Sequence, residues 1–175
     1  VQNKERLVIY VGRIAEEKAL DLVIRGFAKA KRAGVRLLIV GDGPDREKLM
    51  QLRADLNAEN TILFAGPRPS EQIPDYYRAA DAFISASLTE TQGMTFIEAL
   101  ASGLPVLARH DEVLDKLVIE SQTGWYFSDE ETLLSKLDLF LKTDLQPMRA
   151  ACKKQAEPFS AETFYERIMK VYESA

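Results

Sequence analysis

Two positively charged residues follow the first apolar run of the chain. Arg13 stands directly after Gly12, and Lys18 lies five residues beyond Arg13. An arginine offers a bidentate fork and a lysine a compact point charge, so the pair could clamp a diphosphate. Each could equally be a solvated charge on a surface loop. The residues alone leave both interpretations open.

Glycine-rich turns follow two further apolar runs. Gly41 and Gly43 stand in one turn, and Gly66 stands in the other, ahead of Arg68. Tight turns between strands and helices use glycine whether or not they bind a ligand, so this pattern alone is a weak signal. Position 46 is Arg rather than the third glycine of a dinucleotide fingerprint, and no Gly-Lys-Ser or Gly-Lys-Thr occurs. A dinucleotide motif and a P-loop are therefore excluded.

A helix start with anion-binding potential follows a later apolar run. Gly93 stands where a helical pattern begins. The free N–H groups of Met94, Thr95 and Phe96 are expected to face the ligand crevice. Such a helix start suits a phosphate group.

Two carboxylates surround that helix start. Glu98 lies within the helical pattern among apolar residues, and a carboxylate buried in such company needs a partner. That partner could be a structural cation, or two neighbouring hydroxyls of a ribose. Glu90, in the loop before the helix, cannot be distinguished from a solvated charge by physics alone.

The elements that position these residues alternate between strands and helices. Short apolar runs rich in branched residues predict strands buried on both faces, as in a parallel sheet, and helical spacing fills the intervals. The strands are expected at 7–11, 36–40, 61–65, 81–85, 105–108 and 124–127, and the helices at 19–32, 44–56, 70–79, 94–102, 129–142, 146–157 and 160–173.

This order predicts an α/β fold: a Rossmann-like parallel sheet with helices on both faces and a C-terminal helical tail. Residues 1–158 form the expected ligand-binding domain and residues 159–175 the C-terminal helix. In such sheets ligands bind outside the carboxyl ends of the strands. All the candidate residues above follow strand ends, so they are expected to converge there on a phosphorylated ligand.

Composition narrows the possible functions. The chain has 175 residues, 46% of them hydrophobic, and a net charge of −4, which argues against nucleic-acid binding. No apolar run approaches the roughly 20 residues of a membrane span. One cysteine and one histidine exclude a disulfide framework and a multi-histidine metal cluster. Cys152 is expected to be inert, and His110, which has no identifiable partner in the sequence, is not assigned a catalytic role.

The ordered set of motifs resembles the C-terminal, donor-binding domain of retaining GT-B glycosyltransferases of group 1 (family 4). The resemblance covers about residues 6–127 and the final helix. Its most specific part is Glu90-x7-Glu98, which runs into Ala-Leu-Ala-Ser-Gly-Leu-Pro-Val. The other matching segments are Gly12-Arg13 with Lys18, Val-Gly-Asp-Gly-Pro at 40–44, and Asp-Tyr-Tyr with Ala-Asp-Ala-Phe-Ile-Ser at 75–85.

The resemblance implies a role for each matched residue. Arg13 and Lys18 would bind the donor diphosphate and stabilise charge on the departing nucleotide, and Glu90 would contact the transferred sugar, which makes these three the catalytic candidates. Glu98 would hold the ribose, and Arg68 would border the base. The remaining donor-binding candidates are Gly12, Gly41, Gly43, Gly93, Met94 and Thr95.

The implied activity is transfer of a hexose from a nucleoside-diphosphate sugar, with a UDP-sugar as the expected donor, no other cofactor and no metal. No Asp-x-Asp occurs, so Arg13 and Lys18 would supply the positive charge that a metal ion would otherwise bring to the diphosphate. The sequence lacks an initiator Met, so we expect a piece of a longer cytoplasmic protein. The expected partner is an N-terminal acceptor domain of the same protein, through which the full-length enzyme would contact the inner face of the plasma membrane.

Three departures from the family pattern carry information. Ala19 replaces the usual Gly after Lys18, and Arg109 to Glu112 replace a Gly-Gly sequence, which puts the sugar contacts of that loop in doubt. Thr91-Gln92 replaces Gly-Phe and is similar to bacterial glycolipid synthases that glucosylate diacylglycerol. The alternatives are a non-catalytic nucleotide-binding module and a nucleotide-sugar epimerase. The first is disfavoured by the intact set of Arg13, Lys18, Glu90 and Glu98.

Overall fold

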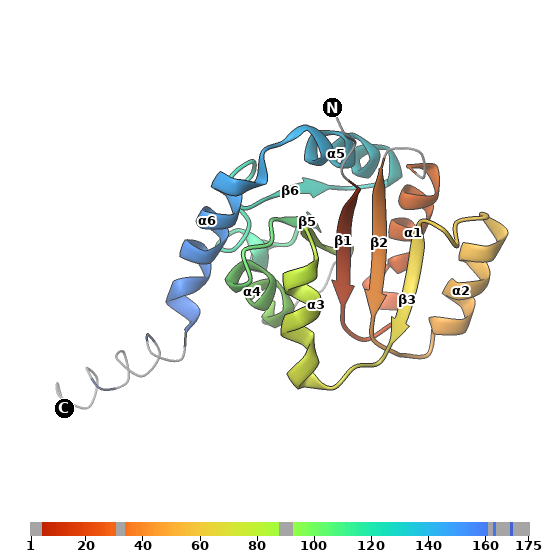
Figure 1. Cartoon of the computed structure of the whole chain (residues 1–175), viewed down its shortest axis with the longest axis horizontal. Coiled ribbons are helices and arrows are strands. Elements are labelled where there is room, and N and C mark those ends of the chain that lie inside the picture. Colours follow the sequence, from red (N-terminus) through yellow and green to blue (C-terminus); the bar gives the residue numbers. More distant parts are fainter. Residues whose placement is uncertain (1–4, 31–33, 88–92, 161–162, 164–168, 170–175) are drawn as a thin grey trace.

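The computed structural model describes residues 5–30, 34–87, 93–160, 163 and 169. Its centre is a six-stranded sheet in the order β3-β2-β1-β4-β5-β6, with every neighbouring pair of strands parallel (Figure 1). All six predicted strands are present within one residue of their expected bounds. They are β1 (Arg6–Val11), β2 (Val35–Val40), β3 (Ile62–Gly66), β4 (Ala82–Ser85), β5 (Val106–Arg109) and β6 (Gly124–Phe127).

The helices that connect the strands also follow the predicted pattern. Helix α5 (Glu130–Lys142) begins in a capping box. The Asp129 carboxylate accepts a hydrogen bond from the Thr132 amide, and the Thr132 hydroxyl accepts one from the Asp129 amide. The third predicted helix is split into a short 3₁₀ turn at Ser70–Gln72 and a following α-helix. The α-helices are α1 (Leu20–Lys29), α2 (Arg46–Asp55), α3 (Ile73–Ala79), α4 (Met94–Ala101), α5 (Glu130–Lys142) and α6 (Leu145–Ala156).

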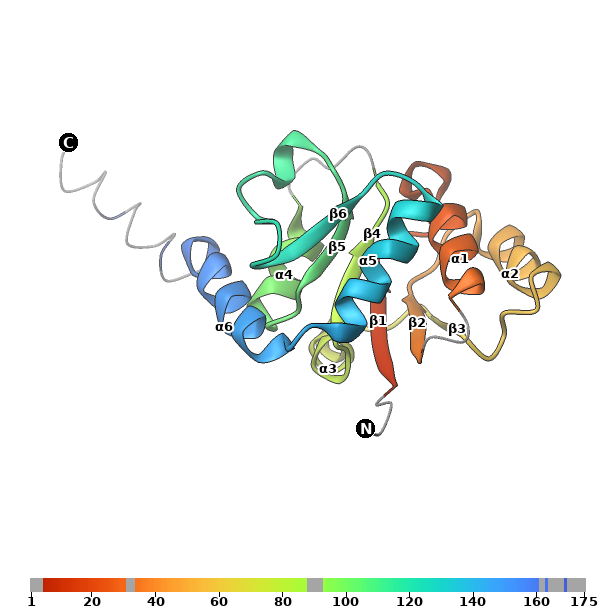
Figure 2. The same ribbon diagram turned by 90° about the horizontal axis from the view of Figure 1, so that it is seen from above.

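Helices cover both faces of the sheet, as predicted. Successive residues of a strand point to opposite faces, and β1 illustrates this: Val8 and Tyr10 belong to one buried cluster, and Ile9 to the other. The first cluster includes residues of α1, α2, α5 and the first half of α6, and the second includes residues of α3, α4 and the second half of α6. Figure 2 shows α1 and α5 on one side of the sheet and α4 on the other. The Rossmann-like α/β fold class is therefore confirmed.

Asp81 holds the amino ends of the two central strands together. Its Oδ2 accepts a hydrogen bond from the Leu7 amide at 3.0 Å, and its Oδ1 lies 3.2 Å from the Arg149 guanidinium on α6. One carboxylate thus joins β1, β4 and α6. The carboxyl ends of β1 and β4 lie at the opposite edge of the sheet.

The strand order reverses between β1 and β4. Chain order runs outward from β1 to β2 and β3 on one side, and then returns to β4, β5 and β6 on the other. The connections on either side of this switch point lie on opposite faces, which opens a crevice at the carboxyl ends of β1 and β4. Figure 1 shows the carboxyl ends of β1, β2 and β3 at the bottom of the view.

The boundary predicted at residue 158 lies inside a short 3₁₀ turn, Glu157–Phe159, which continues directly from α6. Apart from Ser160, Thr163 and Met169, the residues beyond this turn lie outside the described part of the chain. The C-terminal helix at 160–173 therefore stays a prediction.

Candidate functional site

The loops after β1 and β2 are joined by backbone hydrogen bonds. The Gly12 amide donates to the Val40 carbonyl at 3.0 Å, and the Ile14 amide donates to the Asp42 carbonyl at 2.8 Å. Because both loops are held in this way, the segment that carries Arg13 has a defined backbone.

Gly41 and Gly43 make this close approach possible. A Cβ atom at Gly41 would lie 1.9 Å from the Gly12 carbonyl oxygen, and one at Gly43 would lie 2.1 Å from the Ile14 carbonyl oxygen. Gly41 also has a φ of +142°, a conformation that side chains disfavour. Packing between the loops therefore accounts for both glycines, and their predicted contacts with a donor stay predictions.

Lys18 reaches across the switch point. It ends the 3₁₀ turn Glu16–Lys18, and its Nζ donates a hydrogen bond of 3.4 Å to the Oγ of buried Ser87, two residues beyond β4. Ser87 was not assigned a role from the sequence. Its position after a strand at the switch point was the signal that could have identified it.

Arg13 is exposed, and its backbone is held by a side chain of β1. The hydroxyl of buried Tyr10 donates a hydrogen bond of 2.7 Å to the Arg13 carbonyl. The backbone of Arg13 is thus anchored, whereas its side chain is exposed and accessible to a ligand.

The start of α4 contributes backbone amides. Gly93 precedes the helix with a φ of +59°, and its carbonyl accepts hydrogen bonds from the Phe96 and Ile97 amides, both at 3.0 Å. The expectation that the Phe96 amide is free is therefore wrong, because a tight first turn uses it. Met94 and Thr95 remain the amides at this helix start without an intrahelical acceptor. Glu90 lies outside the described residues.

Glu98 is exposed, which corrects the expectation of a buried carboxylate. The apolar residues of α4 that enter the core are Phe96, Ala99 and Leu100. They occupy one face of the helix, and position 98 falls on the other. Proximity in sequence to apolar residues therefore did not place Glu98 inside the protein.

The partner of Glu98 is a tyrosine. The hydroxyl of Tyr77, on α3, donates a hydrogen bond of 3.1 Å to Glu98 Oε2. The sequence analysis gave Tyr77 no role at the site, and its ring is buried, at 2% exposure. Its hydroxyl, however, contacts Glu98, the residue that is expected to bind the ribose. Burial raises the pKa of Tyr77 well above its usual range, and the neighbouring Glu98 charge raises it further, so the hydroxyl remains a donor.

Glu98 and Tyr77 line a pocket of about 380 Å³ between α3, α4 and the end of β1. Much of its wall is apolar, with Val11, Ile73 and Pro74 contributing, and Ser70 and Ser102 also line it. Val11 immediately precedes Gly12, so the pocket opens beside the loop that carries Arg13. An apolar pocket with few placed polar groups is typical of a small-molecule site.

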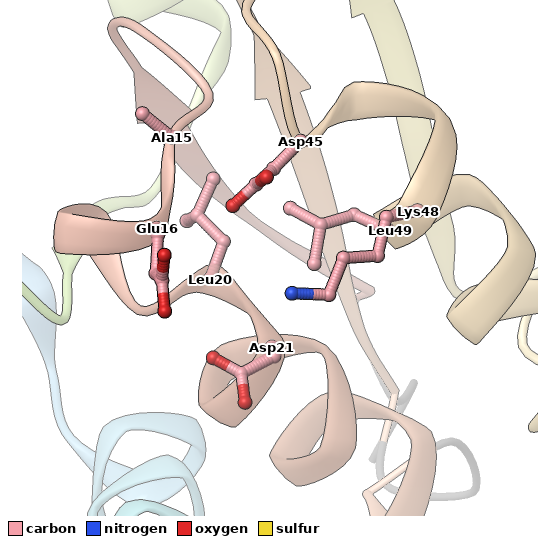
Figure 3. Close-up of a pocket in the computed structure, with 7 residues that line it drawn as sticks. All are labelled: Ala15, Glu16, Leu20, Asp21, Asp45, Lys48 and Leu49. Atoms are coloured by element: carbon pink, nitrogen blue, oxygen red, sulfur yellow. The ribbon is translucent and has the colours of Figure 1, made fainter.

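A second pocket, of about 120 Å³, lies between α1 and α2 (Figure 3). Glu16, Asp21 and Asp45 present three carboxylates around it, and the Lys48 side chain extends toward the start of α1. Its volume is about a third of that of the pocket beside Glu98. Small size and surplus negative charge make it unsuited to a nucleoside diphosphate.

Arg68 lies in the loop after β3, as predicted. Its side chain is exposed, and its guanidinium carbon lies 5.8 Å from the centre of the Tyr76 ring on α3, within cation–π range. Ile73 and Pro74, which lie on the same helix as Tyr76, line the pocket beside Glu98. Arg68 is thus held against the helix that forms one wall of this pocket.

His110 has a partner that the sequence did not reveal. Its Nε2 lies 2.8 Å from Asp115 Oδ1, and its ring meets Tyr126 edge to face at 5.1 Å. Burial raises the pKa of Tyr126 to about 12, and the neighbouring Asp115 and Glu120 charges contribute to the rise. These local contacts account for His110 without a catalytic role.

Cys152 is buried in α6, with its Sγ 3.6 Å from the Thr123 carbonyl. Burial raises the pKa of its thiol to about 12. The thiolate is the reactive form of cysteine. The predicted inertness of Cys152 therefore agrees with its environment.

Two searches concern only the described residues. Among them, no three His, Cys, Asp or Glu side chains are grouped so that they could hold a metal ion. No helix in the same part of the chain has both the length and the apolar character that crossing a bilayer requires.

Comparison with known proteins identifies relatives by sequence. The alpha-monoglucosyldiacylglycerol synthase of Acholeplasma laidlawii is 37% identical over 139 residues, which cover 78% of this chain and 35% of the relative. The synthase of the same name from Streptococcus pneumoniae is 32% identical over 175 residues, which cover 98% of this chain and 40% of the relative. The chain thus spans about two fifths or less of the length of these relatives.

Solved structures share the fold. The pneumococcal O-GlcNAc transferase GtfA, solved in complex with UDP and GlcNAc, superposes with a TM-score of 0.86 at 24% identity, over 99% of this chain and 36% of GtfA. The sequence model of the family described as glycosyl transferases group 1 matches residues 1–159, which include the loops after β1 and β2, the pocket beside Glu98 and the start of α4. The chain therefore belongs to the glycosyl transferases of group 1.

Proposed function

We propose that this chain is the donor-binding part of a retaining, metal-independent glycosyltransferase that moves a hexose from a nucleoside-diphosphate sugar. The observation that carries the proposal is the arrangement at the switch point. Lys18 bridges to Ser87 across β1 and β4, and the pocket with Glu98 opens directly beside the Arg13 loop. Cations and a carboxylate-bearing pocket are thus side by side, as a phosphorylated nucleoside requires.

Each group has a distinct task in this proposal. Arg13 and Lys18 hold the diphosphate and offset the negative charge that grows on it as the glycosidic bond breaks. The Met94 and Thr95 amides at the start of α4 add donors for a phosphate. Glu98 accepts hydrogen bonds from the ribose hydroxyls, and Arg68 borders the base. Glu90 is assigned to a hydroxyl of the transferred sugar by resemblance.

The proposed donor is a UDP-sugar. GtfA, which has the same fold, was solved with UDP. In this chain the apolar pocket of about 380 Å³ is large enough for a nucleoside and supplies few polar groups besides Glu98. A guanine or adenine nucleotide would compete for the same pocket, so the choice of base is part of the test.

The proposed acceptor is a lipid. Two relatives at 32% identity or more are named alpha-monoglucosyldiacylglycerol synthases, and this chain carries the Thr91-Gln92 sequence singled out above. The chain spans less than half of either relative, and we assign acceptor binding to an N-terminal domain of the same protein. The full-length enzyme would then work at the cytoplasmic face of the membrane, and this chain would contact lipid only through that domain.

Thermal unfolding of the chain with a panel of UDP-, GDP- and ADP-sugars tests the proposal. A ligand at a hundred times its dissociation constant should stabilise the fold by about 2.7 kcal/mol. The panel is run in EDTA and again with Mn²⁺. We expect stabilisation in EDTA, because the described residues contain no group of three potential metal ligands. No stabilisation by any nucleotide would refute donor binding, and a strict need for Mn²⁺ would refute metal independence.

A further inference from the structure

We infer that Tyr77 is a positioning residue for Glu98, which fixes the carboxylate so that its second oxygen meets the ribose of a bound nucleotide. This inference rests on the proposed function and adds a residue to its site. The direct observation is the hydrogen bond of 3.1 Å from the Tyr77 hydroxyl to Glu98 Oε2.

The Tyr77 ring is rigidly held. It is 2% exposed and packs against Phe83 with ring centres 6.2 Å apart, and Phe83 in turn meets Phe96 edge to face at 5.2 Å. Phe83 belongs to β4 and Phe96 to α4, so the ring is braced by the central sheet and by the helix that carries Glu98. The hydroxyl therefore occupies a fixed position.

Glu98, in contrast, needs such a fixed point. Its side chain is exposed on the outer face of α4 and reaches the pocket through three rotatable bonds. Immobilising a side chain of this kind on binding costs about 0.5–1.5 kcal/mol. A carboxylate already held by Tyr77 has lost much of that freedom before the ligand arrives. One oxygen is engaged by the tyrosine, and the other, Oε1, stays available to a ribose hydroxyl.

The hydroxyl can serve this purpose throughout the working pH range. Burial and the adjacent Glu98 charge hold the pKa of Tyr77 far above neutrality. The tyrosine hydroxyl therefore stays a donor to Glu98. By holding Oε2, the tyrosine opposes rotation of the carboxylate away from the pocket and leaves Oε1 for the ribose.

The test is Tyr77→Phe, which keeps the buried ring and removes only the hydroxyl. Binding of UDP, 2′-deoxy-UDP and inorganic pyrophosphate to the 175-residue chain is measured by calorimetry in EDTA. We expect UDP affinity to fall about two- to tenfold, from the cost of immobilising Glu98 at binding. The loss for 2′-deoxy-UDP should be smaller, and pyrophosphate, which has no ribose, should bind unchanged.

Two further variants sharpen the result. Tyr126→Phe removes a comparable hydroxyl, which donates to the Val118 carbonyl at 3.1 Å, and should leave UDP affinity unchanged. In a Glu98→Ala background, Tyr77→Phe should cost little more, because no carboxylate remains to be positioned.

Normal UDP binding by a folded Tyr77→Phe chain would overturn the inference and leave the proposed function intact. Equal losses for UDP and pyrophosphate would also overturn it, since they would indicate a general disturbance of the site. Failure of the unaltered chain to bind any nucleotide would instead refute the proposed function, and the inference with it.

Discussion

Lys18 Nζ lies 3.4 Å from Ser87 Oγ, and this contact joins the segment after β1 to the segment after β4. The two residues are separated by 69 positions in the chain. They meet because β1 and β4 are adjacent at the point where the strand order reverses. The hydrogen bond holds the lysine at the crevice rather than in open solvent, where its charge would be worth less.

The two cations are expected to dominate diphosphate binding. Arg13→Ala and Lys18→Ala should each weaken UDP binding about ten- to a hundredfold, since hydrogen bonds to charged groups are worth about 1.5–3 kcal/mol. Isothermal calorimetry with UDP measures both. Arg25→Ala and Lys48→Ala remove exposed cations near α1 and α2 and serve as matched controls. Unchanged affinity in both site variants would defeat the diphosphate assignment.

Glu98 is expected to recognise ribose rather than phosphate. Glu98→Gln should weaken binding of UDP and leave inorganic pyrophosphate unaffected, because only the nucleotide presents a diol to the carboxylate. Because Glu98 is exposed, we expect the variant to fold normally, and thermal unfolding without ligand checks this. Equal losses for both ligands would remove the ribose assignment.

Ala19 is expected to be a site of strain. It stands where the family pattern has glycine, and its φ of 46° and ψ of 41° place it in the left-handed region. This region costs a residue with a Cβ about 1–2 kcal/mol. Ala19→Gly should therefore stabilise the chain by roughly 0.5–1 kcal/mol after the added freedom of the unfolded glycine is subtracted.

Urea unfolding of Ala19→Gly measures this gain. Ala30→Gly is the matched control, because Ala30 ends α1 with an ordinary φ of −82° and should lose stability on the same change. Destabilisation by both substitutions would contradict the idea of strain at Ala19.

The acceptor is expected to be a lipid in the full-length enzyme. That enzyme should transfer sugar to diacylglycerol or its monoglycosyl derivative in preference to soluble sugars. The chain alone should not sediment with anionic liposomes, because it has a net charge of −4 and anionic lipids attract clusters of Lys and Arg. Transfer to a protein or polysaccharide instead would refute the lipid acceptor, and strong liposome binding by the chain would refute its expected lack of membrane affinity.

The sequence by itself determined the elements and their order. Apolar runs such as 37–40 and 105–108 fit a sheet covered on both faces, and the helical spacing between the runs favours parallel strands with crossovers. The candidate cations and glycines could be placed at strand ends for the same reason. These patterns are local, so they can be recognised without knowledge of distant contacts.

Only the tertiary structure decided which side chains meet. The exposure of Glu98 depended on which face of α4 turned to the core, and its partner Tyr77 came from another helix, 21 positions away. Likewise, the fold of the loop after β5 brings His110 into contact with Asp115. Gly41 is required because the Gly12 carbonyl of a neighbouring loop leaves no room for a side chain. Such pairings depend on how whole elements pack against one another, so they cannot be inferred from short-range spacing in the sequence.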